Sequence, residues 1–299
     1  MDKRIVATRS GPEPHWVGDG FPARSLFTYQ DPAESLSPFL LLDHVGPAQF
    51  PPADRPRGVG THPHRGFETV TIVYAGEVEH RDSAGHGGLI GPGDVQWMTA
   101  GAGVLHEEFH SPGFAHRGGA LEAAQLWVDL PARDKLTAPR YQTLRSERIP
   151  QVGLERGGVA RIVAGRLGSV AGPAVTFSEL NVWDVRLEGG TQQRLPVPAG
   201  HNTLLVVLRG VVHLGSRRLG PDTFAVLERE GDSVWLEASE EAVALLLLSG
   251  VPLHQPVVGH GPFVMTSASE IQQAFADFQR GRFGQIAPRE LGSGAAGAG

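Results

Sequence analysis

The sequence contains no cysteine, and this absence excludes several kinds of chemistry at once. Without thiols the chain forms no disulfide bonds, has no cysteine nucleophile and offers no sulfur anion to a metal. A metal site in this protein must therefore be built from histidine and carboxylate ligands.

The chain also lacks a positively charged cluster and a long apolar run. Its formal net charge of −6 at pH 7 gives no electrostatic footprint for nucleic acid or an anionic membrane. The longest apolar stretch, residues 242–248, is far shorter than the ~20 residues that span a bilayer. Residues 1–10 carry charges and do not resemble a signal peptide. We therefore predict a cytoplasmic protein that binds neither nucleic acid nor membranes directly.

The composition favours many short strands. The chain has 299 residues, enough for one large or two medium domains, and 40% of them are hydrophobic, so a packed core is feasible. Its 40 glycines and 23 prolines are numerous for a helical protein and fit strands joined by tight turns. An all-β protein is the expected fold class.

Two short pairs of residues are candidate metal ligands. His62 and His64 are separated by one residue, and so are His106 and Glu108. Residues i and i+2 of a strand point to the same face, so the members of each pair are neighbours. A single His-x-His also occurs in surface turns, but the second pair, which follows a glycine-punctuated hairpin, favours ligands. Two such pairs facing each other inside a barrel predict a metal site with three imidazoles and one carboxylate.

The identity of the carboxylate ligand is open on spacing alone. Glu108 shares a face with His106, whereas Glu68 has the same parity as His62 and His64, although Gly66 can break the strand between them. Spacing favours Glu108 without excluding Glu68. The other carboxylate could orient an imidazole or act as a general base.

The remaining histidines carry weaker signals. His80 and His86 flank a predicted hairpin tip, and we expect both to face solvent. His110 has the parity of Glu108 and could line the mouth of a cavity. The histidines without a partner at ligand spacing are expected in structural or surface positions; they are His15, His116, His201, His213, His254 and His260.

The second half of the chain repeats the order of the first. Residues 196–203 align with residues 62–69, with Gly200 and Thr203 in the places of Gly66 and Thr69. Both ligand histidines are replaced by proline, at Pro196 and Pro198, and no histidine lies between residues 213 and 254 to replace His106. Glycine and threonine are common enough for a chance match, but the shared order favours a duplicated barrel whose second copy has lost the site.

With these residues assembled, the chain closely resembles the pirin family, whose members are double-barrel proteins of the cupin superfamily. The most specific matching segment is Thr-His-Pro-His-Arg-Gly-Phe-Glu-Thr at residues 61–69. The other matching segments are residues 41–44, 97–101, 106–108, 125–128, 137–141, 260–265 and 281–284. The resemblance covers about residues 3 to 290.

The resemblance implies an all-β fold of two tandem cupin (jelly-roll β-barrel) domains with a short C-terminal helix. We expect a metal-binding cupin at residues 1–140 and a degenerate cupin without metal at residues 141–290, connected through residues 131–150. A helix is expected from the capping spacing of Ser267 and Glu270 up to Gly281. Residues 291–299 are expected to form a disordered tail.

The resemblance also implies iron in the first barrel, held by His62, His64, His106 and Glu108, and so favours Glu108 over Glu68. Family members are described as quercetin 2,3-dioxygenases, which open a flavonol with O₂ and release carbon monoxide. Others are described as iron-dependent coregulators of transcription or modulators of metabolic enzymes.

Three functional hypotheses follow. The first is a dioxygenase that uses one divalent metal, Fe(II) before Mn, Ni, Cu or Zn, to open a flavonol-like substrate with O₂. A carboxylate, for which Glu108 is the candidate, would take the proton of the substrate hydroxyl. The second is an iron-dependent regulatory protein that binds a protein partner, and the third is a structural or storage metal barrel. A monomer is expected in each case.

Overall fold

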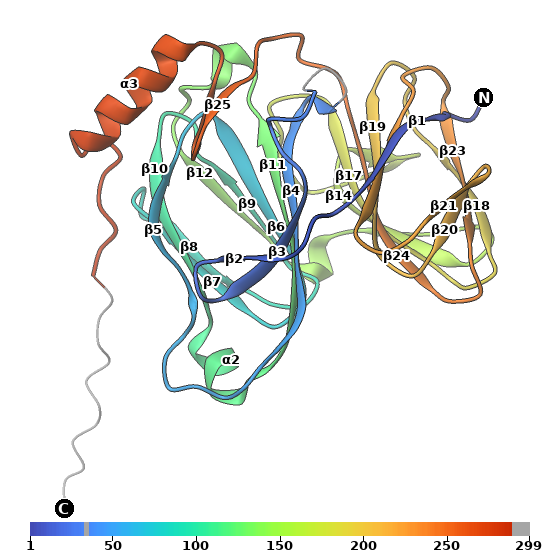
Figure 1. Ribbon diagram of the computed structural model, residues 1–299, viewed down its shortest axis with the longest axis horizontal. Helices are drawn as coiled ribbons and strands as arrows, with labels where there is room; N and C mark the ends of the chain where they lie inside the picture. Colours follow the sequence, from blue (N-terminus) through green and yellow to red (C-terminus); the bar gives the residue numbers. More distant parts are fainter. Residues whose placement is uncertain (33–35, 289–299) are drawn as a thin grey trace, which may run out of the picture.

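Two β-barrels lie side by side in the computed structural model, which describes residues 1–32 and 36–288 (Figure 1). In each barrel a seven-stranded sheet faces a four-stranded sheet. A short helix α2 (Pro112–Arg117) lies in the first barrel, and a longer helix α3 (Ala268–Gln279) follows the last strand. The predicted all-β class, with two barrels and a short C-terminal helix, is confirmed.

The first barrel holds the histidine-rich strands. Its large sheet has the order β12 (Arg140–Leu144), β9 (Val95–Thr99), β6 (Phe67–Ala75), β11 (Gly119–Asp129), β4 (Phe39–Phe50), β3 (Phe21–Phe27), β2 (His15–Val17). Its small sheet has the order β5 (Gly58–His64), β10 (Val104–His110), β7 (Val78–Asp82), β8 (Gly87–Ile90). The predicted ligands therefore lie on two adjacent strands of the small sheet.

The second barrel has the same arrangement. Its large sheet has the order β1 (Ile5–Ser10), β22 (Thr223–Leu227), β19 (Asn202–Arg209), β24 (Val243–Gly250), β17 (Leu180–Leu187), β14 (Gly158–Ala164), β13 (Gln151–Gly153). Its small sheet has the order β18 (Gln192–Pro196), β23 (Ser233–Ala238), β20 (Val212–Leu214), β21 (Arg217–Leu219). Strand for strand, the neighbours match those of the first barrel. The expectation of a duplicated barrel agrees with this pairing.

The strand pairing does not divide the chain between residues 140 and 141, where the sequence placed the domain boundary. β12 begins at Arg140 and completes the first barrel by pairing with β9. β1, from the opposite end of the chain, fills the equivalent position in the second barrel by pairing with β22. The predicted connection, residues 131–150, therefore contains a strand of the first sheet. Long-range pairing of this kind leaves no local pattern in the sequence.

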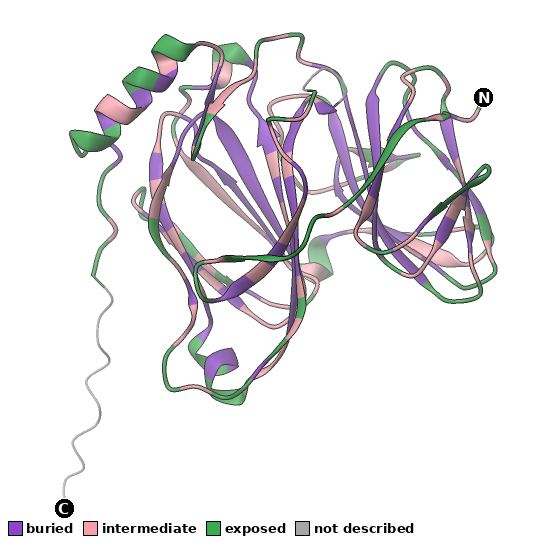
Figure 2. Cartoon of the chain, in the orientation of Figure 1, coloured by how far each residue is buried: buried purple, intermediate pink, exposed green. Residues whose placement is uncertain are grey.

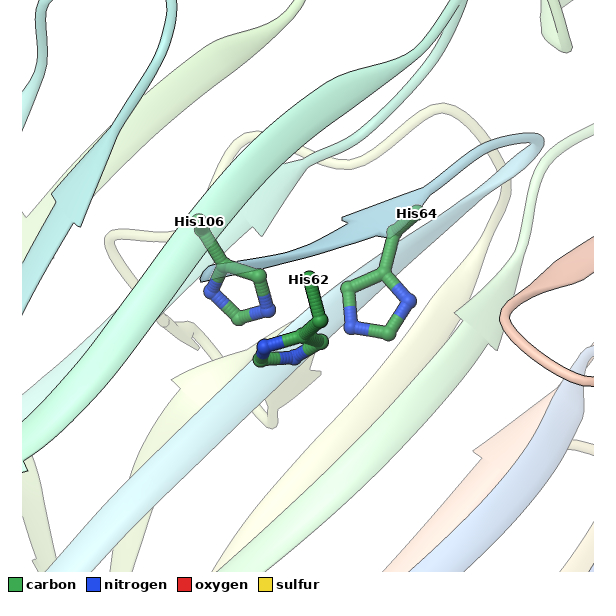
Figure 3. Close-up of side chains that lie close together, drawn as sticks. All are labelled: His62, His64 and His106. Carbon is green, nitrogen blue, oxygen red and sulfur yellow. The ribbon is translucent and has the colours of Figure 1, made fainter. Parts of the chain in front are cut away.

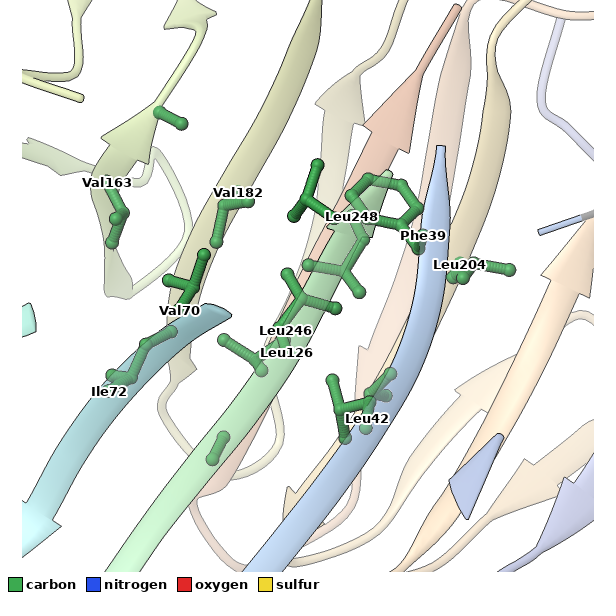
Figure 4. Packing of buried hydrophobic residues seen from close by; sticks show 14 of the residues in the cluster. Phe39, Leu42, Val70, Ile72, Leu126, Val163, Val182, Leu204, Leu246 and Leu248 are labelled. Carbon is green, nitrogen blue, oxygen red and sulfur yellow. The ribbon is translucent and has the colours of Figure 1, made fainter. Parts of the chain in front are cut away.

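The two large sheets pack face to face and form the largest core of the molecule. Because successive residues of a strand point to opposite faces, Val70 and Ile72 of β6 turn toward the second barrel, while Thr69 and Thr71 turn into the first. They share a buried cluster with Val182 and Leu246 of the second barrel (Figure 4). This double coverage explains why residues 243–248 of β24 form a continuous apolar run and why every residue of the strand is buried.

The last part of the chain returns to the first barrel. Its strands β25 (Val258–His260) and β26 (Phe263–Met265) form a hairpin, and Phe263 bridges to Arg65 beside the histidine pair. Helix α3 follows, with the Ser267 side chain accepting a hydrogen bond from the Glu270 amide, as predicted. Its outward face is exposed, whereas the strands between the barrels are buried (Figure 2).

Two short strands of the second barrel, β15 (Arg166–Leu167) and β16 (Val170–Ala171), pair with each other. No helix in the described parts of the chain is long and apolar enough to cross a membrane. The predicted disordered tail, residues 291–299, lies outside the described residues.

Candidate metal centre

The three predicted histidine ligands come together between β5 and β10. Antiparallel pairing sets His106 directly opposite His62. The ring centroids are 4.2 Å apart for His62 and His106, 4.8 Å for His64 and His106, and 4.9 Å for His62 and His64. Each ring offers a nitrogen within 4.8 Å of those of the other two. Figure 3 shows the three rings gathered at one place.

Backbone carbonyls set the protonation pattern of two of these rings. His62 Nδ1 donates to the Gly60 carbonyl at 2.8 Å, and His64 Nδ1 donates to the Pro262 carbonyl at 3.3 Å. A carbonyl can only accept, so each Nδ1 carries the proton and each Nε2 keeps a free lone pair. The carbonyl for His64 comes from the returning C-terminal segment, 198 residues away in the chain.

The third ring, that of His106, has a buried nitrogen that could bind a metal. His106 Nε2 is buried and has no hydrogen-bond partner. A buried polar atom without a partner is unfavourable by about 1–3 kcal/mol. Two imidazoles with an Nε2 lone pair, and a third whose Nε2 has no partner, fit a divalent metal that prefers nitrogen ligands.

Burial keeps two of the rings neutral. Desolvation first, and the neighbouring His62 second, hold the pKa of both His64 and His106 well below the usual value of 6.5. An imidazole binds a metal only in its neutral form. At neutral pH these two imidazoles are therefore already neutral, and they can bind a metal without first releasing a proton.

Glu108 lies beside this cluster rather than within it. Its carboxylate accepts hydrogen bonds from Gln96 Nε2 at 3.1 Å and Gln125 Nε2 at 3.0 Å. It belongs to a second group of possible ligands, which it forms with His80 and His106. The pairing of β10 with β5 has a bulge between His106 and Glu108, and a bulge re-aims the side chains that follow it.

Glu68 points away from the histidines. It shares a face of β6 with Val70, toward the second barrel, and its carboxylate accepts a hydrogen bond from Thr99 at 2.7 Å. Burial outweighs this hydrogen bond and raises the pKa of Glu68 to about 7. The parity argument for Glu68 does not hold because the chain turns at Gly66, whose φ is +91°.

His80 was expected to face solvent, and that prediction is wrong. Its side chain is fully buried on β7, where its ring stacks on Tyr141 at a centroid distance of 4.8 Å. The alternation of residues 78–82 carries the missed signal, because Val78, His80 and Asp82 are buried while Glu79 and Arg81 are less so. His86, at the hairpin tip, is 38% exposed.

His110 does not line the cavity mouth. Its ring packs at 4.6 Å from Phe50 and 5.1 Å from Phe114, and its Nε2 donates to the Gly20 carbonyl at 2.9 Å. These contacts give the ring a structural role in an aromatic cluster at the end of the barrel.

A small cavity of about 50 Å³ opens beside the histidines. Apolar side chains such as Val45 and Ala123 form part of its wall, and its polar lining consists of Asp43, His62, Thr71, Glu108 and Gln125. A space of this size admits a diatomic molecule or the edge of a larger one. Within residues 1–32 and 36–288, both groups of possible metal ligands lie in the first barrel.

Comparisons with known proteins agree with this architecture. The pirin family model matches residues 20–128, and the model of the pirin C-terminal cupin domain matches residues 182–284. A Pseudomonas aeruginosa protein named "Putative quercetin 2,3-dioxygenase" is 56% identical over 94% of this chain and 98% of its own length.

Solved structures show the same fold. Quercetin 2,3-dioxygenase from Acinetobacter baumannii is 52% identical, covers 96% of this chain and 100% of its own, and superimposes with a TM-score of 0.93. A bacterial pirin from Escherichia coli, solved in complex with nickel(II), is 21% identical, covers 82% of this chain and 99% of its own, and has a TM-score of 0.61.

Proposed function

The chain belongs to the pirin family, and we propose that it is a divalent-metal-dependent dioxygenase that opens a flavonol such as quercetin. The observation that carries the proposal is the buried cluster of His62, His64 and His106, with one Nε2 that has no partner. The names of the similar proteins from Pseudomonas aeruginosa and Acinetobacter baumannii support the reaction class.

In this proposal the three histidines would hold the metal through Nε2, and the neighbouring Glu108 would supply the carboxylate ligand. Such a metal, when bound, supplies Lewis acidity and one-electron chemistry toward O₂. Fe(II) is the proposed ion, with Mn, Ni, Cu and Zn as alternatives. The nickel(II) complex of the Escherichia coli pirin is consistent with a site that accepts more than one ion.

Glu108 is also the proposed proton acceptor. It lines the cavity, and the amides of Gln96 and Gln125 hold its two oxygens in place. A carboxylate positioned in this way can take the hydroxyl proton of an enol-type substrate. The Gln amides would then donate to the oxygen that remains unprotonated.

The cavity limits how a flavonol can bind. Pockets that enclose ligands of drug size usually measure about 300–1,000 Å³, whereas this cavity measures about 50 Å³. The hydroxyl-bearing edge of the substrate would enter beside His62 and Glu108, and the remaining rings would lie at the mouth near Val17 and Val59. This arrangement suits any planar phenol with an enolisable edge.

The proposal is tested by O₂ consumption and carbon monoxide release from quercetin with protein loaded anaerobically with Fe(II). We expect turnover by the wild-type protein and none by His62→Ala or His106→Ala. His213→Ala, a histidine of the second barrel, is the matched control and should turn over normally. Undiminished turnover by His106→Ala would refute metal-centred catalysis.

The alternative is an iron-dependent regulatory protein that binds a transcription factor or a metabolic enzyme. One observation favours it: the cavity does not enclose a flavonol, while the Pro262 carbonyl links His64 to the returning segment at the surface. Pull-downs with Fe(II)- and Fe(III)-loaded protein distinguish the two functions, because identical partners in both states would exclude iron-state signalling.

The monomeric state and the cytoplasmic location remain predictions. Size-exclusion chromatography tests the first, and cell fractionation tests the second.

A further inference from the structure

His80 connects the metal centre to a fixed carboxylate. Its Nδ1 lies 3.4 Å from Nδ1 of His106, and its Nε2 lies 3.4 Å from Oδ2 of Asp82. All three side chains are buried, with exposed fractions of 0% for His80, 1% for His106 and 4% for Asp82. The three groups form a continuous buried chain that leads away from the histidine cluster.

Only one arrangement of protons satisfies the contacts of His80 with Asp82, Gln96 and His106. An ionised Asp82 can only accept, so His80 Nε2 carries a proton. The Gln96 amide nitrogen, 3.3 Å from His80 Nδ1, can only donate, so His80 Nδ1 keeps a lone pair. His106 Nδ1 lies against this lone pair, and the contact is favourable only if His106 Nδ1 carries a proton and donates it. His106 Nε2 is then unprotonated, and it is the nitrogen that has no partner in the protein. His80 and Asp82 therefore select the tautomer of His106 that can bind a metal at the histidine cluster.

His80, His106 and Glu108 lie close enough together for a second metal site, but they do not form one. The orientation of the Gln96 amide excludes a metal ion from this group. Its Oε1 accepts a hydrogen bond from the Tyr141 hydroxyl at 3.0 Å, which turns its amide nitrogen toward the group. That nitrogen lies 3.3 Å from His80 Nδ1 and 3.1 Å from Glu108 Oε1. Amide protons occupy the space between the ligand atoms and would repel a cation.

Asp82, at the far end of this hydrogen-bonded series of side chains, is held rigidly. The backbone amides of Ala84 and His86 each donate to Asp82 Oδ1 at 2.9 Å, so the hairpin tip fixes the carboxylate. The ring of His80 is held nearly parallel to that of Tyr141, at an interplanar angle of 17°. A histidine that donates to a fixed acceptor is oriented for its metal and is a stronger electron donor.

From these contacts we propose that His80 and Asp82 are positioning residues for the metal centre. They fix the orientation and the tautomer of His106 and raise its donor strength toward the ion. This inference rests on the proposed metal binding by His106 and not on the identity of the organic substrate.

The test compares two substitutions of His80 in the full-length chain. His80→Phe keeps an aromatic ring against Tyr141 but removes the acceptor, whereas His80→Gln retains an acceptor oxygen within reach of His106 Nδ1. Affinity for Co(II) is measured by chelator competition, together with the Co(II) absorption spectrum. We expect His80→Phe to weaken binding by about 10–100-fold, as the loss of an outer hydrogen-bond partner usually does, and to shift the spectrum. His80→Gln should restore most of the affinity.

His86→Gln is the matched control, because His86 contacts Asp82 from the solvent side and does not contact His106. It should bind Co(II) as the wild-type protein does. Wild-type affinity and spectrum in His80→Phe would overturn the proposal, and so would a second Co(II) ion per wild-type chain that His80→Phe loses. A wild-type chain that binds Co(II) but, loaded with Fe(II), does not turn over quercetin counts against the dioxygenase and leaves these expectations unchanged.

Discussion

The two barrels have the same strand order and fill their interiors in opposite ways. Where β5 and β10 pair in the first barrel, His62 faces His106 across the strands. Where β18 and β23 pair in the second, the inward side chains are Leu195, Val234 and Leu236, which belong to an apolar core. One copy is packed for stability, while the other carries polar groups that the fold does not satisfy by itself.

Cavity size alone would point to the wrong barrel. The second barrel has a groove of about 530 Å³ lined by Arg156, Arg194 and Trp235, more than ten times the volume beside the histidines. No group of possible metal ligands lies in that groove among the described residues. The candidate metal centre therefore rests on a cluster of donor atoms rather than on open volume.

The largest expected effect comes from removing a ligand in one barrel and a histidine in the other. His106→Ala should weaken Fe(II) binding by more than about 100-fold, beyond the 10–100-fold typical of losing an outer partner. His213→Ala should leave the affinity unchanged. Chelator competition measures both, and similar losses in the two variants would contradict the assignment of the site to the first barrel.

Metal removal should destabilise the two barrels unequally. With free metal at 100 times its Kd, binding stabilises the folded protein by about 2.7 kcal/mol. Chelation should therefore speed amide hydrogen exchange in β5 and β10, with little change in β18 and β23. Equal acceleration in both barrels would mean that the metal acts on the whole molecule or binds elsewhere.

Acid should weaken the metal-free protein through its buried histidines. The folded-state pKa of His64 and of His106 lies below 6.5 because of burial. Below pH 6.5 the unfolded chain takes up protons that the folded chain does not, so the free energy of unfolding falls as the pH drops from there toward the lowered pKa values. Urea denaturation between pH 7.5 and 5.5 measures this slope.

Glu68 has the opposite sign and partly masks that slope. Its folded-state pKa of about 7 exceeds its ordinary value of 4.5, so its contribution to stability is complete below pH 4.5 and is lost as the pH rises to 7. Glu68→Gln removes this contribution, and the decline toward acid should become steeper. An unchanged slope in Glu68→Gln would show that Glu68 is ionised in the folded protein at these pH values.

The smallest effect concerns the helix that packs on the first barrel only. Ser267 caps α3 through the Glu270 amide, and Ser267→Ala should destabilise the helix by about 1 kcal/mol. Faster hydrogen exchange should be confined to α3 and the neighbouring hairpin. Faster exchange in the second barrel would show that the returning segment couples the two barrels.

The sequence predicted those features that depend on neighbouring residues. Alternation along a strand is sufficient to pair His62 with His64, and the shared order of glycine and threonine is sufficient to reveal the duplication. The Ser267 cap is equally local. Features set by distant parts of the chain were not predictable: β1 completes the second barrel, Pro262 holds His64, and a turn at Gly66 reverses the face of Glu68. His80 was missed because a hairpin tip usually faces solvent, whereas β7 turns this ring inward, where it stacks on Tyr141.

Metal stoichiometry in two proteins tests the central claim most directly. Elemental analysis after Fe(II) loading and desalting would compare the wild-type chain with a variant in which His62, His64 and His106 are all alanine. One ion per wild-type chain and none in the variant is the predicted result. Equal metal content in the two proteins, or none in either, would contradict the assignment of the metal centre to the first barrel.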